Sequence, residues 1–150
     1  MMRDKLSNAM KEAMKAKETR RLSTVRLIQT AIKDRDIANR GVGKDPVSDD
    51  DILQILQKMI KQREESAKIY SEGGREELAE QEREEITIIR GFMPEQMSDD
   101  QVLEACKGVI AEIGAQGLRD MGKCISVLKE RYAGQMDFAK ASAIVKDLLK

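Results

Sequence analysis

Apolar residues recur every three or four positions along nearly the whole chain, which is the period of amphipathic α-helices. Between residues 3 and 16, one face collects Leu6, Ala9, Met10, Ala13 and Met14. A longer stripe from Thr19 to Asn39 holds Leu22, Val25, Leu27, Ile28, Ala31 and Ile32. No segment shows the strict alternation that is typical of a half-buried strand. The pattern therefore predicts an all-α fold.

Helix breakers and caps divide the middle of the chain. Residues 39–46 contain Asn, Gly, Asp and Pro and are predicted to form a loop. Ser48 is a predicted N-cap, because three aspartates follow it and favour the positive end of a helix dipole. Its helix carries the stripe Ile52, Ile55, Leu56, Met59, Ile60, Ala67 and Tyr70 and ends at Gly73-Gly74. A fourth helix, with Leu78, Ile86 and Ile89 on its apolar side, runs to about Arg90.

The last third predicts three further helices. Pro94 excludes helical geometry from the residue before it, and Ser98 with Gln101 forms a capping box that opens a helix through Ile113. The segments Leu118–Arg131 and Phe138–Leu149 complete the set, the latter capped by Asp137. We place a boundary between Phe92 and Ser98, which predicts a four-helix N-terminal domain over residues 1–95 and a three-helix C-terminal domain over residues 96–150.

Composition narrows the class of protein. Apolar residues make up 41% and charged residues 36% of the chain, which is too apolar for a disordered protein and too charged for a membrane protein. No apolar run reaches the length of a membrane span, and no signal peptide is recognisable. Cys106 and Cys124 lie in helical patterns without metal or redox spacing and are expected to be buried hydrophobes. We therefore expect a cytoplasmic protein without a membrane partner.

The sequence contains no recognisable set of catalytic residues. Histidine is absent, which excludes Ser-His-Asp and Cys-His catalysis and His-ligated metals. The glutamates between Glu76 and Glu85 fan around one helix, so they predict a solvated face and not a cation site. No catalytic residue, cofactor or metal ligand is therefore assigned, and whether the chain is an enzyme stays open. Aromatic residues are only 3%, too few for a platform that stacks unpaired bases.

The charges are segregated although the net charge is zero. Residues 1–40 hold 11 Lys and Arg against 5 Asp and Glu, and residues 64–85 hold 3 against 9. These segments either lie side by side and partly neutralise each other, or they leave a basic face for a phosphate backbone. The candidate residues for such a face are Lys15, Lys17, Arg20, Arg21 and Arg26.

Gly122 is a second candidate contact. Within a helix, glycine costs about 1 kcal/mol relative to alanine, so a compensating reason is expected. Either the glycine allows close helix packing, or it allows an RNA backbone to approach beside Lys123. Four other cations of the C-terminal domain extend this candidate site: Lys107, Arg119, Lys129 and Arg131.

Several motifs together resemble the YqeY-like family, whose fold is shared by the tail domain of the GatB subunit of tRNA-dependent amidotransferases. They are Val25-Arg-Leu-Ile-Gln-Thr-Ala-Ile-Lys33, Ile60-Lys-Gln-Arg63, Gly74-Arg75, Phe92-Met-Pro-Glu-Gln-Met-Ser98, Asp120-Met-Gly-Lys123 and Val145-Lys-Asp-Leu-Leu149. The resemblance covers essentially the whole chain. It departs at Ala133-Gly-Gln-Met136, where the family usually has a basic turn, which weakens a phosphate contact there.

The resemblance implies a four-helix domain followed by a three-helix domain and an accessory that helps to hold tRNA. Carbon–nitrogen ligation with glutamine as the amide donor is implied by association only, since that chemistry lies in other domains of the amidotransferase. The implied partner is tRNA or an aminoacyl-tRNA/amidotransferase complex, and sequence-specific DNA binding is not expected. Zero net charge and few aromatics support an alternative, a protein-interaction module that binds no RNA. A third option is an enzyme that uses carboxylates alone.

Overall fold

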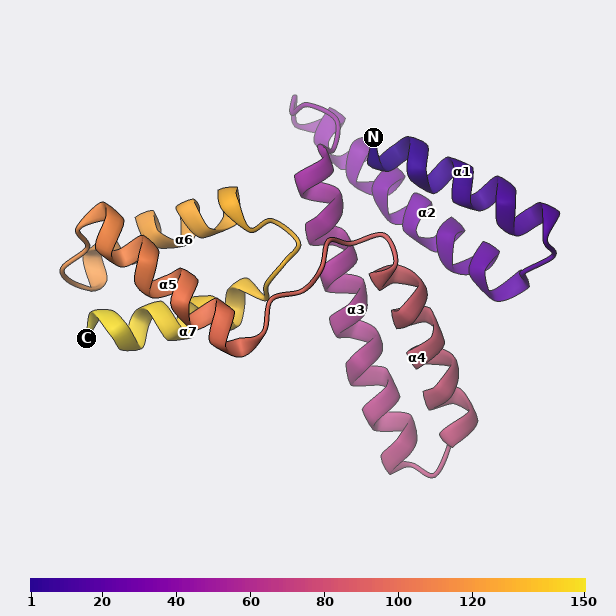
Figure 1. The fold of residues 1–150 in the computed structure, drawn as a ribbon. Helices are drawn as coiled ribbons and strands as arrows, with labels where there is room; N and C mark the ends of the chain where they lie inside the picture. Colours follow the sequence, from indigo (N-terminus) through magenta and orange to yellow (C-terminus); the bar gives the residue numbers. More distant parts are fainter. The chain divides into compact units, whose positions relative to one another are not determined.

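The computed structural model describes residues 1–150, and all of its regular structure is helical (Figure 1). There are seven α-helices, one short 3₁₀ helix and no β-strand, so the all-α prediction is confirmed. The elements are α1 (Met2–Lys15), α2 (Thr19–Gly41), α3 (Asp49–Glu72), α4 (Glu76–Arg90), α5 (Asp99–Ile113), η1 (Leu118–Asp120), α6 (Met121–Arg131) and α7 (Phe138–Leu149). None of these helices is both long and apolar enough to cross a bilayer.

The internal contacts divide the chain into two compact units, Met1–Met93 and Pro94–Lys150. The first contains α1 to α4 and the second contains α5 to α7. Each unit has its own hydrophobic core. That each unit folds alone, as an independent domain, stays a prediction.

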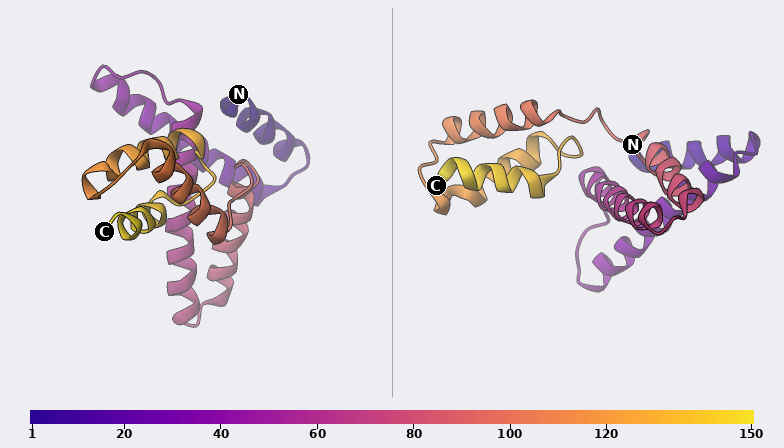
Figure 2. Two further views of the ribbon diagram at one scale, coloured as in Figure 1. Left: turned by 60° about the vertical axis from the view of Figure 1, so that its left-hand side comes forward. Right: turned by 90° about the horizontal axis from the view of Figure 1, so that it is seen from below.

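The first unit is built from two helical hairpins. Figures 1 and 2 show α3 and α4 running antiparallel along most of their length, and α1 lying against α2. The faces that meet are the apolar stripes seen in the sequence, because burying such a stripe is the main stabilising term for an amphipathic helix. Fully buried side chains of this core include Leu6, Val25, Ile28, Ile52, Leu56 and Ile89.

The second unit packs three helices around a small core (Figure 2). Each of α5, α6 and α7 contacts the other two. The two cysteines, Cys106 and Cys124, are both fully buried in this core, and burial raises the pKa of each thiol. The prediction that they act as small hydrophobes is confirmed.

Local capping fixes where the helices begin. The hydroxyl of Ser48 accepts from the Asp51 amide at 3.2 Å, and the Asp51 carboxylate accepts from the Ser48 amide at 3.2 Å. Ser98 and Gln101 form the same reciprocal box at 3.2 and 2.8 Å. At the other end of α5, Gly114 takes a left-handed conformation with φ of 69° and ends the helix. These boundaries follow the prediction because the interactions that set them are local.

Some expectations are wrong. Helix α2 continues through Asn39 and Arg40 to Gly41, two residues beyond the predicted loop start, since its last carbonyls are satisfied by the amides of residues 42–44. The predicted helix Leu118–Arg131 begins as a 3₁₀ turn, and only Met121–Arg131 is α-helical. Leu27 of the predicted α2 stripe is 47% exposed, because the contacts of α2 leave that side of the helix uncovered.

Candidate nucleic-acid interface

The cations expected to bind phosphate in the second unit fall into two groups. Arg131 forms a bidentate ion pair with Glu112, with N–O distances of 2.5 and 2.6 Å. This bond raises the pKa of Arg131 and lowers that of Glu112. Lys107 lies 3.8 Å from a Glu104 carboxylate oxygen. These two cations already have carboxylate partners, so a phosphate would have to compete for them.

Arg119, Lys123 and Lys129 form the second group. All three are exposed, and none has a carboxylate within ion-pair distance. Arg119 and Lys123 are held on either side of Asp120, in the 3₁₀ turn and the first turn of α6. The Asp120 carboxylate accepts from the Gln116 amide at 3.0 Å, and this bond together with the two cations lowers its pKa. The turn therefore presents two exposed cations that interact with the Asp120 carboxylate at a distance beyond 4.0 Å.

Gly122 lies between these cations, and the structure excludes one of its two interpretations. A Cβ built on Gly122 would meet no atom within 4 Å, and the residue is exposed. Close helix packing is therefore not the reason for glycine at this position. The predicted helix Leu118–Arg131 placed Gly122 in its interior, but the residue lies in the first turn of α6. The surface beside Lys123 is open to an external partner.

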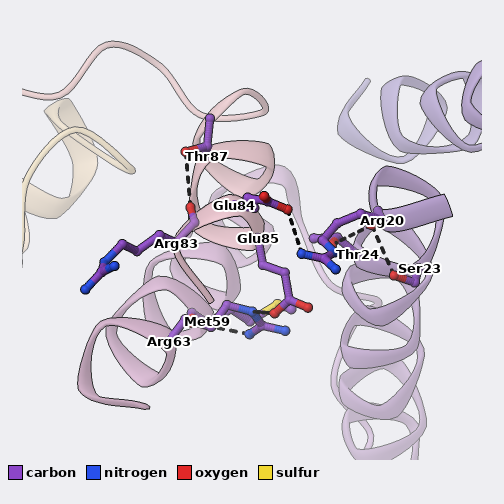
Figure 3. Close-up of polar contacts among 9 residues, drawn as sticks. All are labelled: Arg20, Ser23, Thr24, Met59, Arg63, Arg83, Glu84, Glu85 and Thr87. Atoms are coloured by element: carbon purple, nitrogen blue, oxygen red, sulfur yellow. Dashed lines mark hydrogen bonds and ion pairs between the residues drawn. The ribbon is translucent and has the colours of Figure 1, made fainter. Parts of the chain in front are cut away.

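The predicted basic face of the first unit is neutralised in part, at Arg20 and Arg21, whereas Lys15, Lys17 and Arg26 have no carboxylate within 4.0 Å. Arg20 forms an ion pair with Glu84 of α4 at 2.6 Å (Figure 3). Arg21 lies over the ring of Phe92, 5.4 Å from its centroid, and 3.9 Å from a Glu18 carboxylate oxygen. Of the three arginines predicted as RNA contacts in this unit, Arg26 alone is exposed and without a carboxylate within 4.0 Å. The basic and acidic segments do meet through Arg20 and Glu84, as one of the two interpretations expected.

The acidic helix also holds an ion pair that the sequence did not reveal. Arg63 of α3 donates to Glu85 of α4 at 2.9 Å, and the two side chains are only 14% and 11% exposed (Figure 3). Arg63 also donates to the Met59 carbonyl at 3.4 Å. Glu85 was expected on a solvated face, but it lies on the side of α4 that carries Ile86 and Ile89 and is buried. Its position four residues before Ile89 is the signal that could have identified it.

Burial also affects the neighbouring Glu82. Desolvation raises the pKa of its carboxyl group, and the negative charge of Glu85 raises it further. Glu85 itself is engaged by a guanidinium, so the site does not present a free base. We infer that Arg63, Glu82 and Glu85 have a structural role and that the Arg63–Glu85 ion pair stabilises the packing of α3 against α4.

A groove of about 670 Å³ lies in the second unit, where α5 begins. Three carboxylates line it, from Glu95, Asp100 and Glu104, together with the Tyr132 ring. The segment before α5 is tied to the turn after α6, because the Met97 amide donates to the Gln135 carbonyl at 2.9 Å and the Gln96 side chain donates to the Gly134 carbonyl at 2.5 Å. The remaining lining residues are Gln96, Met97, Gln101, Ala105 and Gln135. With acids and no cations along its walls, this groove does not suit a phosphate.

The fold thus defines a class: an all-helical protein of two compact units. The sequence model of the family described as Yqey-like protein matches residues 3–149. The chain therefore belongs to the Yqey-like protein family.

Relatives with this sequence pattern occur in fungi. A Clavispora lusitaniae protein named "Altered inheritance of mitochondria protein 41, mitochondrial" is 31% identical over 108 residues, which is 71% of this chain and 61% of the relative. The protein of that name from Pyrenophora tritici-repentis is 27% identical over 134 residues, covering 85% of this chain and 71% of the relative. The one from Lachancea thermotolerans is 32% identical over 88 residues, or 59% of this chain and 46% of the relative. The chain thus spans about half to two thirds of the length of the curated relatives that it matches.

Proposed function

We propose that this protein is an accessory module that binds tRNA, alone or within an aminoacyl-tRNA/amidotransferase complex, and supplies no catalytic group of its own. The observation that carries the proposal is the pair Arg119 and Lys123, which are exposed, have no carboxylate within 4.0 Å and lie next to the open surface at Gly122. The resemblance to an amidotransferase tail supports it. Glutamine-dependent carbon–nitrogen ligation would then be the activity of the complex that the module joins.

The proposal implies recognition through the RNA backbone and shape. Phe92 is buried in the first core, and Tyr132 and Phe138 pack against the second, so these rings do not form a stacking platform. Unpaired Arg and Lys side chains are suited to phosphate contacts, which position a protein on RNA without reading its sequence. We therefore expect binding to several tRNAs with similar affinity and a steep dependence on salt.

A salt titration tests this proposal. We would measure the binding of bulk tRNA by fluorescence anisotropy between about 25 and 200 mM salt for the wild type, Lys123→Ala and Arg119→Ala/Lys123→Ala. Each lost phosphate contact should lower the salt slope by about 0.7 to 0.9 and weaken binding about tenfold at low salt. Lys140→Ala is the matched control, because it removes an exposed cation from α7 and is expected to bind like the wild type. Absence of saturable wild-type binding at 25 mM salt would refute the proposal.

The second candidate is a protein-interaction module that binds no RNA. The acidic groove lined by Glu95, Asp100, Glu104 and Tyr132 favours it, because carboxylates beside an aromatic ring suit a basic side chain. Capture of a protein from lysate that is lost with Asp100→Asn/Glu104→Gln, in the absence of any RNA binding, would select this candidate.

The compartment that we propose is the cytoplasm. Two free, buried cysteines support it, since reduced thiols are typical of a reducing compartment. The word "mitochondrial" in the names of the fungal relatives describes those proteins. Imaging of the tagged protein in its own cells tests the proposal, and an organellar signal would contradict it.

A further inference from the structure

One side of α2 carries a line of three cations, of which only Arg26 was a candidate RNA contact from the sequence. Arg26, Lys33 and Arg40 are spaced seven residues apart, and all three are exposed. A seven-residue step turns an α-helix by two turns less about 20°, so the three side chains stay within about 40° of one line. They are separated by about 10.5 Å each, or about 21 Å from first to last, at 1.5 Å per residue. We call these three residues the α2 ridge.

The ridge lies opposite the buried side of the helix. Val25, Ile28 and Ile32 face the core, and they lie roughly 100° to 160° around the helix from Arg26. No carboxylate lies within 4.0 Å of any ridge cation, although the charge of Arg40 helps to lower the pKa of Asp36. This distinguishes the ridge from Arg20 and Arg21 on the same helix, which are held by Glu84 and by Phe92 and Glu18.

Carboxylates are scarce along this line. No Asp or Glu occurs between Thr19 and Lys33. Of the two acids that follow, Asp36 is already occupied, because it accepts from the Arg3 guanidinium at 2.9 Å and from the Val47 amide at 2.8 Å. Asp34 is exposed but points about 100° around the helix from Lys33. The ridge is therefore a line of cations along which Asp34 and Asp36 are the only carboxylates of the helix.

The residues between the cations fit a nucleic-acid backbone. The exposed positions on the same side are Thr19, Thr30 and Ile37, together with Ser23, whose hydroxyl already donates to the Arg20 carbonyl at 3.1 Å. Hydroxyl groups contact phosphates and ribose 2′-OH groups, whereas α2 contains no aromatic residue on which an unpaired base could stack. A straight line of cations about 21 Å long is better matched by the regular backbone of a helical RNA segment than by a flexible single strand.

We propose that the α2 ridge binds the phosphate backbone of double-helical RNA, as a contact surface additional to the one at Gly122. The inference rests on the proposed RNA-binding function and names the surface of the first unit that takes part and the class of RNA structure that it contacts. Three contacts of this kind should contribute about 2 to 3 units to the salt slope.

The test compares two triple variants with equal charge. The ridge variant is Arg26→Gln/Lys33→Gln/Arg40→Gln. The control is Lys58→Gln/Lys68→Gln/Arg75→Gln, which removes three exposed cations from α3 and the α3–α4 turn. Both are expected to melt within a few degrees of the wild type, because exposed unpaired charges contribute little to stability. The probes are a 20-base-pair RNA duplex, a single-stranded poly(U) of equal phosphate number, and poly-glutamate as a competitor.

The wild type and the control should bind the duplex more tightly than poly(U), and the ridge variant should lose at least tenfold in affinity and about 2 units of salt slope. If the wild type binds duplex and tRNA while the ridge and control variants behave alike, the ridge inference is overturned and the proposed function stands. Equal binding of poly(U), or equal competition by poly-glutamate at the same charge, also overturns it. If the wild type binds no RNA at all, the proposed function fails, and the ridge inference fails with it.

Discussion

Replacing Gly122 by alanine separates the effect of this residue on folding from its effect on binding. Had the glycine been required for close helix packing, an added methyl group would clash and destabilise the protein by about 1 to 3 kcal/mol. The structure predicts the opposite sign, since the methyl group would meet no atom within 4 Å. The residue lies in the first turn of α6, where its conformation is one that alanine also adopts.

The expected gain is set by the unfolded chain and the helix propensity. Gly→Ala at a compatible helical position stabilises a protein by about 0.4 to 1 kcal/mol. For a chain of this size the melting temperature should rise by about 1 to 4 °C, and the urea midpoint should increase at an unchanged m-value. Gly108→Ala is a matched control, because Gly108 lies inside α5, is exposed and also has nothing within 4 Å of its Cβ position. Both variants are expected to be more stable than the wild type.

Binding should distinguish the two glycines. If the RNA backbone approaches Gly122, the alanine variant should bind tRNA more weakly although it is more stable, while Gly108→Ala should bind like the wild type. A lower melting temperature for Gly122→Ala would refute the steric reasoning. Equal tRNA affinity for both alanine variants would remove Gly122 from the interface and leave only the neighbouring cations.

Three further predictions concern stability and domain structure. Arg63→Ala should destabilise the protein by about 2 to 4 kcal/mol in urea unfolding, because it leaves the Glu85 carboxylate buried without its partner. Arg20→Ala should cost less than about 1 kcal/mol, since its ion pair with Glu84 is exposed. Similar losses for both variants would show that burial of the ion pair does not determine its contribution to stability. The hydrogen bonds from Arg3 and from the Val47 amide lower the pKa of Asp36, so its contribution to stability should be complete above the unfolded value near pH 4 and disappear as the pH falls through the lower folded value. Asp36→Asn should therefore flatten the acid limb of the stability curve, and an unchanged limb would contradict this. A fragment of residues 94–150 should be helical by circular dichroism and should melt cooperatively, because it contains a complete hydrophobic core of its own. An unstructured fragment that melts without cooperativity would show that the two units are not independent domains.

The Arg63–Glu85 pair shows why part of the fold was hidden in the sequence. From the sequence, Glu85 is one member of an acidic run that predicts a solvated face. Which member of the run is buried depends on how α4 is turned against α3, and that rotation is decided by the packing of Ile86 and Ile89. The groove beside Tyr132 was missed for a similar reason, since its walls come from residues 95–105 and from 132–135, which only the tertiary fold brings together.

Most helices, their N-terminal caps and the all-α class could be predicted from local patterns in the sequence. Apolar periodicity and the Ser48 and Ser98 capping boxes depend on residues three to four positions apart, so they can be recognised from the local sequence. Which cations have a carboxylate partner depends on the packing of the helices. The sequence does not distinguish Arg20 from Arg26, yet Arg20 forms an ion pair with Glu84 of α4 whereas Arg26 faces solvent. A charge can bind a partner only if the fold has not already supplied one, and that depends on residues distant in the chain.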